Sequence, residues 1–292
     1  PAAQKGLSHA LALLDEKATE RRAEFLVELA NVCDITGDQE QASQAVTEAL
    51  QLTSALRDHP LRLQTLTAAA NLAVQKAQFE DARTWFEMAL EIARQMDDKS
   101  HEGNLLIQFA DVELRAGQAQ EARKLYEQAL EIARQHKIHA LEAEALGAVG
   151  YILPSVGESM ALAREYIEES AKLRRMLGDR LGEARALCNL TAFLHAYGEY
   201  EEALLLGDEA LAKNRAVNYR RGAAIARSAQ GLAAYELGQF EQARLMIEEA
   251  RQEFAEIGEQ DAFGLHTGSL GLVASAEGKW EEAEALYKEA LA

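Results

Sequence analysis

The sequence predicts an all-α solenoid of about seven stacked helix–turn–helix hairpins, and three observations support this. The segment Ala-Leu-Glu-Ile-Ala-Arg-Gln at 89–95 returns unchanged at 129–135. Self-similarity at a fixed spacing indicates a repeat architecture, in which each unit contacts only its neighbours. The 292 residues include only three prolines, and helix-favouring Ala, Leu, Glu, Arg and Gln are abundant. Small residues also recur in register along the whole chain.

One alanine near the start of each second helix marks this register, in steps of 40 residues with one step of 41: Ala42, Ala82, Ala122, Ala163, Ala203, Ala243 and Ala283. A glycine five residues earlier supplies a left-handed cap where the first helix ends: Gly37, Gly117, Gly198, Gly238 and Gly278. Ala77 replaces it once, and Gly157 stands six residues before Ala163. An aromatic residue follows several of these turns and is expected to fill the corner between the helices: Phe79, Tyr200, Phe240 and Trp280.

Two further columns of small residues let the helices approach closely. Seven residues after the marker, two helical turns on, lie Ala49, Ala89, Ala129, Ser170, Ala210, Ala250 and Ala290. Twelve residues before it, allowing for the extra residue of the fourth unit, lie Ala30, Ala70, Ala110, Gly150, Thr191, Gly231 and Gly271.

These positions predict the helix bounds. First helices are expected at about 17–36, 58–76, 99–116, 138–156, 179–197, 219–237 and 260–277. Second helices are expected at about 39–56, 79–96, 119–136, 159–177, 200–217, 240–257 and 280–292, with a partial repeat over 1–15. We expect one continuous domain over 1–292, with repeats at about 17–56, 58–96, 99–136, 138–177, 179–217, 219–257 and 260–292. Because the chain begins with Pro1, we expect it to be a piece of a larger protein.

The fourth hairpin is irregular. Gly147, Gly150 and Pro154 lie in its first helix, and an interior proline costs a helix about 3 kcal/mol. That helix is expected to kink or to end early. Two interpretations stay open: a tolerated local defect, or a hinge or ligand-shaped break.

The motif Gly-x-[Phe/Tyr/Trp]-Glu-x-Ala, with a small residue before it and Ala seven residues after it, resembles the tetratricopeptide repeat over the whole chain. The period of 40 departs from the usual 34, and the usual closing proline is absent. This longer form is similar to the repeats of bacterial STAND-type signal-transduction ATPases and related transcription activators, and to those of kinesin light chain. The resemblance implies a right-handed superhelix. HEAT or armadillo repeats have a similar period but lack this turn.

Composition and charge narrow the function. A net charge of −18 argues against nucleic-acid or anionic-membrane binding. One basic zone could hold an acidic partner: Lys172, Arg174, Arg175, Arg180, Lys213, Arg215, Arg220 and Arg221. Cys33 and Cys188 are expected to be buried thiols, and no signal peptide or membrane-spanning run is evident, so we expect a cytoplasmic location.

No catalytic or metal-binding constellation is evident. The chain lacks a phosphate-binding glycine loop, a Gly-x-Ser-x-Gly elbow and a paired-histidine zinc motif. His136 and His139 are three residues apart but have no matching carboxylate cluster. We therefore expect no enzyme activity, no cofactor and no metal.

Binding remains, and the resemblance places it on the first helices, which line the concave groove of tetratricopeptide folds. Asn31, Asn71 and Asp111 share one column, where amides can bond an extended peptide backbone or, alternatively, neighbouring helices. The groove becomes apolar from Tyr151 onward, which indicates either a partner site or tighter packing. The expected peptide- or ligand-binding residues are Asn31, Asn71, Asn104, Asp111, Tyr151, Arg185, His195 and Tyr235.

Three functions follow as hypotheses. The first is a non-catalytic scaffold or sensor module of a larger signalling or transcription-regulating protein, with a peptide or protein in its groove. The second is a module that binds a small-molecule inducer near Tyr151, Arg185, His195 and Tyr235. The third is a structural array that self-associates through exposed terminal repeats.

Overall fold

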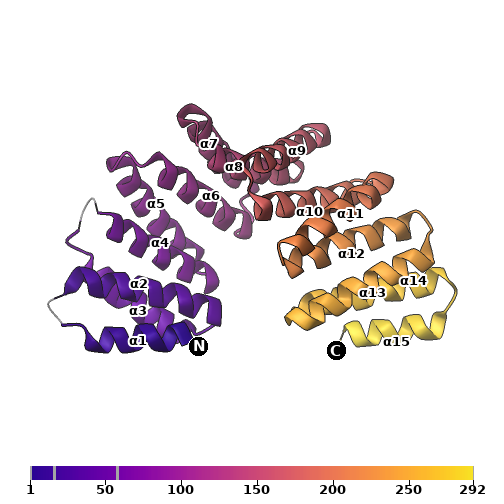
Figure 1. Cartoon of the computed structure of the whole chain (residues 1–292), viewed down its shortest axis with the longest axis horizontal. Coiled ribbons are helices and arrows are strands. Elements are labelled where there is room, and N and C mark those ends of the chain that lie inside the picture. The colour runs from indigo at the N-terminus through magenta and orange to yellow at the C-terminus, as the bar shows by residue number, and fades with distance from the viewer. Residues whose placement is uncertain (1, 16–17, 57–58, 292) are drawn as a thin grey trace. The chain divides into compact units, whose positions relative to one another are not determined.

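The structure is a computed structural model that describes residues 2–15, 18–56 and 59–291, and within these residues every regular element is a helix (Figure 1). The first helices of the hairpins are α2 (Thr19–Thr36), α4 (Pro60–Gln75), α6 (Lys99–Arg115), α8 (His139–Ile152), α10 (Arg180–Ala196), α12 (Arg220–Glu236) and α14 (Gln260–Ala276). The second helices are α3 (Gln39–Leu52), α5 (Phe79–Gln95), α7 (Ala119–His136), α9 (Met160–Leu177), α11 (Tyr200–Ala216), α13 (Phe240–Ile257) and α15 (Trp280–Ala290). The expected partial repeat is α1 (Ala2–Leu13).

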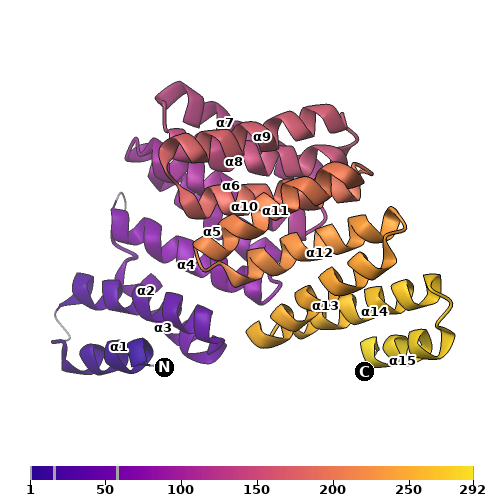
Figure 2. The same cartoon turned by 45° about the vertical axis from the view of Figure 1, so that its right-hand side comes forward.

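The all-α solenoid prediction is therefore confirmed, and most predicted helix bounds hold within one or two residues. The chain divides into two compact units, residues 1–148 and 149–292, called unit 1 and unit 2 below. In each unit consecutive helices form antiparallel hairpins, as Figure 2 shows for α2–α3 and for α12–α13. Whether the chain forms one domain stays a prediction.

The small-residue columns form the contacts between helices. All seven marker alanines are buried, and so is the residue seven positions later in the first six hairpins. In the other column, a Cβ atom added to Gly231 would lie 2.7 Å from Ile247 Cγ1. A Cβ atom on Gly271 would lie 2.6 Å from the Tyr287 ring. The register therefore records where the two helices of a hairpin touch.

The turns confirm the left-handed caps. Gly117, Gly198 and Gly238 have φ angles of 78°, 87° and 73°, where only glycine is unstrained. Ala77 occupies the same place with φ 55°, a conformation that costs a residue with a Cβ atom about 1 kcal/mol. Three of the aromatic residues that follow the turns are partly buried: Phe79, Tyr200 and Phe240. Trp280 is 70% exposed, so the prediction that it fills the corner is wrong.

Two helices, α3 and α8, end earlier than predicted. Helix α3 stops at Leu52, where Arg62 of the next hairpin donates to the carbonyl oxygen of Leu50 and to the hydroxyl of Thr53. Helix α8 stops at Ile152, and Pro154 lies in a 3₁₀ turn over Leu153–Val156. The early end caused by the proline is therefore confirmed.

Candidate functional site

The exposed faces of α2 and α4 carry two matching amides in unit 1. Asn31 and Asn71, 40 residues apart, are both exposed and line one small hollow of about 10 Å³. That volume accommodates about one water molecule. The other lining residues are Ala30, Ala42, Val46, Ala68 and Leu72. Because α2 packs against α4, the repeat period brings the two amides to the same opening.

Neither amide side chain hydrogen-bonds another group within the described ranges. Each side chain therefore keeps two N–H donors and one carbonyl acceptor for water or a ligand. The alternative, in which the column bonds neighbouring helices, does not hold for Asn31 or Asn71. That alternative does hold for Asp111, the third residue of the column.

Asp111 lies on α6, and its carboxylate accepts a hydrogen bond from the buried Tyr126 hydroxyl of α7. The residue keeps an exposed surface, but the protein atoms around its carboxyl group desolvate it and raise its pKa, while the Tyr126 bond opposes this effect. Asp111 therefore fastens the two helices of its own hairpin. Asn104, two turns earlier on α6, is half-buried.

Three of the four predicted residues of unit 2 each contact a different aromatic neighbour. Arg185 of α10 lies over the Tyr219 ring, with Cζ 5.3 Å from the ring centroid. The rings of His195 and Tyr200 are 6.0 Å apart, and those of Tyr235 and Phe240 are 5.9 Å apart. Tyr151, at the end of α8, is 65% exposed. Among the described contacts, none joins two of the predicted four, so a shared small-molecule pocket stays a prediction.

Burial lowers the pKa of His195, and the charge of Glu236 partly opposes this. The imidazole is therefore neutral near pH 7 and offers one donor and one acceptor. Packing partly buries Ile225 and Leu232 of this face but leaves two of its leucines exposed. Leu265 and Leu272 of α14 are 69% and 47% exposed.

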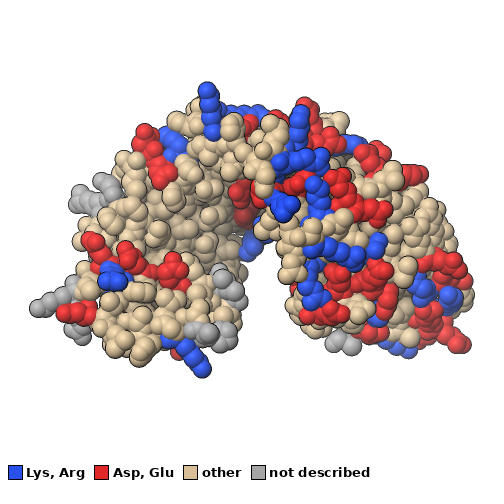
Figure 3. All heavy atoms as spheres, in the orientation of Figure 1, with Lys and Arg blue, Asp and Glu red and all other residues tan. Residues whose placement is uncertain are grey.

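The predicted basic zone is largely neutralised within unit 2. Six of its eight cations form ion pairs: Arg174–Asp179, Arg175–Glu183, Lys213–Glu183, Arg215–Glu253, Arg220–Glu256 and Arg221–Glu259. The hydrogen bonds from Lys213 and Arg175 hold the pKa of the buried Glu183 below its ordinary value, against the effect of burial. Acidic and basic side chains accordingly mix on the visible face of this unit (Figure 3).

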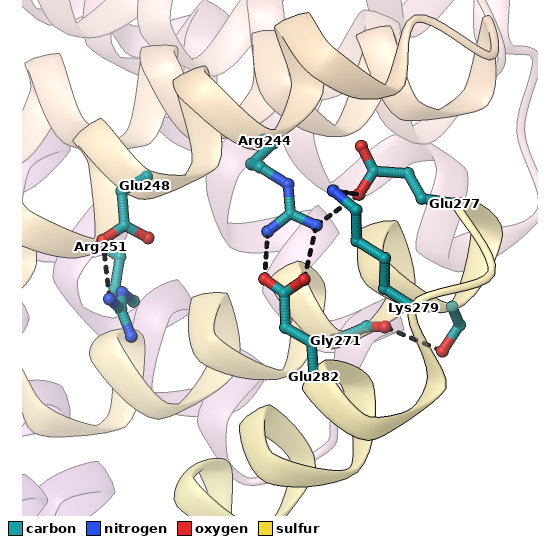
Figure 4. Close-up of polar contacts among 8 residues, drawn as sticks. Arg244, Glu248, Arg251, Gly271, Glu277, Lys279 and Glu282 are labelled. Atoms are coloured by element: carbon teal, nitrogen blue, oxygen red, sulfur yellow. Dashed lines mark hydrogen bonds and ion pairs between the residues drawn. The ribbon is translucent and has the colours of Figure 1, made fainter.

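Sequence reasoning missed the ion pairs that join successive hairpins. Arg164 binds Glu202, and Arg244 binds Glu282, each across 38 residues. Figure 4 shows Arg244 of α13 between Glu282 of α15 and Glu277, with the Lys279 ammonium beside Arg244 and paired with the same Glu277 oxygen. The signal was available: an Arg one residue after a marker alanine, and a Glu one residue before the next marker.

A second missed feature is a buried polar pair beneath the first-helix face of unit 2. Ser228 of α12 and His266 of α14 form a hydrogen bond through Oγ and Nε2. The Nδ1 atom of His266 lies 2.6 Å from the carbonyl oxygen of Ala262, so we assign the proton to Nδ1 and the acceptor role to Nε2. The pair holds α12 and α14 together.

The remaining features of the described chain concern metal ligands, cysteines and membrane-spanning helices. They include no group of three or more His, Cys, Asp or Glu residues arranged to hold a metal ion. Cys33 and Cys188 are buried, as predicted, and burial raises the pKa of Cys188 to about 12. None of the described helices is long and apolar enough to cross a membrane.

Comparisons with known proteins agree with this architecture. Tetratricopeptide repeat models match residues 21–95, 105–136 and 267–292. Comparison with curated proteins found no match to the chain.

Similar solved structures span almost the whole chain. The apo form of RapI is 13% identical with a TM-score of 0.73, over 92% of this chain and 96% of that one. NprR in complex with its cognate peptide NprX is 12% identical with a TM-score of 0.61, over 95% and 78%. A STAND protein with a tetratricopeptide repeat sensor from Pyrococcus horikoshii is 17% identical with a TM-score of 0.68, over 90% of this chain and only 41% of that protein. At these identities the likeness shows the fold.

The repeat register, the buried small-residue columns and these matches lead to one conclusion. The chain is a tetratricopeptide-repeat array, and its fold is similar to that of the STAND protein with a tetratricopeptide repeat sensor.

Proposed function

We propose that the chain is a non-catalytic sensor module that binds a peptide, or an extended segment of a protein, on the exposed faces of its first helices. One observation carries the proposal. Asn31 and Asn71 recur at the repeat period, line the same opening and have no hydrogen-bond partner within the described chain. Structures similar in fold include NprR with its cognate peptide and a Rap protein with competence and sporulation factor.

The chemistry of the two amides suits an extended peptide. An extended chain presents N–H and C=O groups along its length, and an Asn side chain can accept from one and donate to the other. Binding of this kind depends little on peptide side chains. The side chains of other hairpins would then select the sequence.

A selection experiment tests the proposal. A randomised 12-residue peptide library is displayed and selected on the full chain, and enriched peptides are titrated by fluorescence anisotropy. We expect Asn31→Ala with Asn71→Ala to weaken binding about 10- to 100-fold, since each lost hydrogen bond contributes about 0.5–1.5 kcal/mol.

The matched control removes two exposed amides from second helices, Gln44→Ala on α3 with Gln128→Ala on α7. This variant should bind within about twofold of the wild type, a change that corresponds to about 0.4 kcal/mol. If the two double variants lose affinity equally, or if selection enriches no peptide, the proposal is wrong. Self-association through terminal repeats stays a separate prediction, which the mass of the chain at rising concentration would test.

A further inference from the structure

The first helices α10, α12 and α14 of unit 2 place side chains in rows that run from helix to helix. Helix α10 packs against α12, and α12 packs against α14. One row consists of Arg185, Ile225 and Leu265, six residues before the small-residue column. A second row consists of Ala192, Leu232 and Leu272, one residue after it.

Small residues separate these two rows. The row between them, three residues before the column, consists of Cys188, Ser228 and Gly268. Cys188 and Ser228 are buried, and a Cβ atom on Gly268 would meet only Ala290, at 3.8 Å. The row is therefore covered at Cys188 and Ser228 and has room only at Gly268, and on α14 Leu265 and Leu272 stand on either side of Gly268 with large exposed fractions.

Arg185 is the charged member of the first row, and its guanidinium has no carboxylate partner within the described chain. Most cations of the neighbouring basic zone are already paired with acids. Arg185 instead stacks on Tyr219, and this contact orients the guanidinium while leaving its N–H edge available. An oriented guanidinium recognises a carboxylate through two parallel hydrogen bonds.

Other charges on this face lie at its margins. Arg221 pairs with Glu259 at the N-terminal end of α12, and Asp261 is exposed at the start of α14. Glu236, near His195, lies at the other end of α12. Between these ends the one charged residue of α12 and α14 is Arg227, which is 18% exposed and already paired with Glu249 of α13. A ligand that runs along the rows from Arg185 therefore meets one unpaired positive charge and then mainly apolar side chains.

We infer that this face binds a peptide segment with a carboxylate on Arg185 and two large apolar side chains, one beside Ile225 and Leu232 of α12 and the other beside Leu265 and Leu272 of α14. The inference rests on the proposed peptide-binding function and adds the chemistry of the peptide. Helix axes in contact lie about 8–10 Å apart, and an extended chain advances about 3.3 Å per residue. Adjacent helices are thus about three peptide residues apart. In the peptide, the two apolar residues therefore lie about three and six positions from the residue that carries the carboxylate, in either chain direction.

The selected library tests this spacing directly. We expect enriched peptides to carry Asp, Glu or a free C-terminus about three and six residues from Leu, Ile, Val, Phe or Met. Arg185→Gln should weaken the best peptide about tenfold or more, the usual worth of a charge-assisted pair. Leu265→Ser with Leu272→Ser should weaken it by a similar factor. Circular dichroism spectra establish that each variant is folded.

The matched control is Arg180→Gln, which removes the same charge from the same helix off these rows and should change affinity less than about twofold. Peptides in which the acid is replaced by its amide, or the C-terminus is amidated, show which carboxylate Arg185 holds. The peptide that has lost the carboxylate held by Arg185 should bind the wild type and the Arg185→Gln variant with equal affinity. Arg185→Glu should regain affinity for a peptide that carries Lys at the acidic position.

Each outcome decides the inference. Enriched peptides without an acid, or equal losses from Arg185→Gln and Arg180→Gln, would overturn it. If peptides bind and depend on Asn31 and Asn71 but not on Arg185, the inference fails while the proposed function stands. If no peptide is enriched, both fail.

Discussion

Gly231 offers a sharp test of the small-residue column. It lies on α12, and the Gly231→Ala variant places a Cβ atom 2.7 Å from Ile247 Cγ1 and 3.0 Å from the Ile247 backbone nitrogen. Favourable contacts with carbon begin at about 3.5 Å, so α13 would have to move by roughly 0.5–0.8 Å. Ile247 is fully buried, which leaves its side chain little room to turn away.

The magnitude follows from two opposing effects. Overpacking of a buried contact costs about 1–3 kcal/mol, while Gly→Ala inside a helix contributes about 1 kcal/mol. Gly264→Ala on α14 is the matched control, because its new Cβ atom would meet nothing nearer than the Ala290 carbonyl oxygen at 3.5 Å. The Gly264→Ala variant should therefore gain the helix-propensity contribution of Gly→Ala without any cost of overpacking. We expect Gly231→Ala to be less stable than Gly264→Ala by about 1–3 kcal/mol.

Urea unfolding followed by far-ultraviolet circular dichroism measures this difference. Because repeat arrays can unfold in parts, hydrogen exchange of α12 and α13 gives the local value. If both variants gain stability equally, the column does not mark a close helix contact and the reasoning about the register is wrong.

Three further predictions concern stability. Ala77→Gly should stabilise unit 1 by about 1 kcal/mol, since it relieves a left-handed turn, and an unchanged urea midpoint would contradict this. Burial lowers the pKa of His266, so stability should fall as the pH drops below the unfolded value of 6.5, and His266→Gln should flatten that pH profile in thermal melts. Asn214→Ala removes hydrogen bonds to the carbonyl oxygens of Ala184 and Ala210, and calorimetry should show a loss of about 1–3 kcal/mol.

Positions that repeat made the fold predictable. The alanine and glycine register placed every hairpin, because helix contacts and left-handed turns tolerate few residue types. The early end of α3 was missed, and so was Arg62 of the next hairpin, which reaches back to the last turn of α3. The Ser228–His266 pair was missed for a similar reason, since residues 38 apart meet only after α12 and α14 pack together.

The candidate site was less predictable. The column of Asn31, Asn71 and Asp111 was visible in the sequence, but only the structure shows that Tyr126 binds Asp111 and that the two amides remain free. The same holds for Arg185. Its spacing resembled that of a ligand residue, but Glu183 on the same helix could have paired with it, and only the structure shows that Glu183 pairs with Arg175 and Lys213 instead.

Photo-cross-linking tests the central claim, that first-helix faces bind peptide, most directly. A benzophenone amino acid placed at Gln75, one turn beyond Asn71 on α4, should form an adduct with a selected peptide. The same group at Gln44 on α3 or Gln128 on α7 should form none above background. Adducts from Gln44 or Gln128 that match or exceed those from Gln75 would contradict the account.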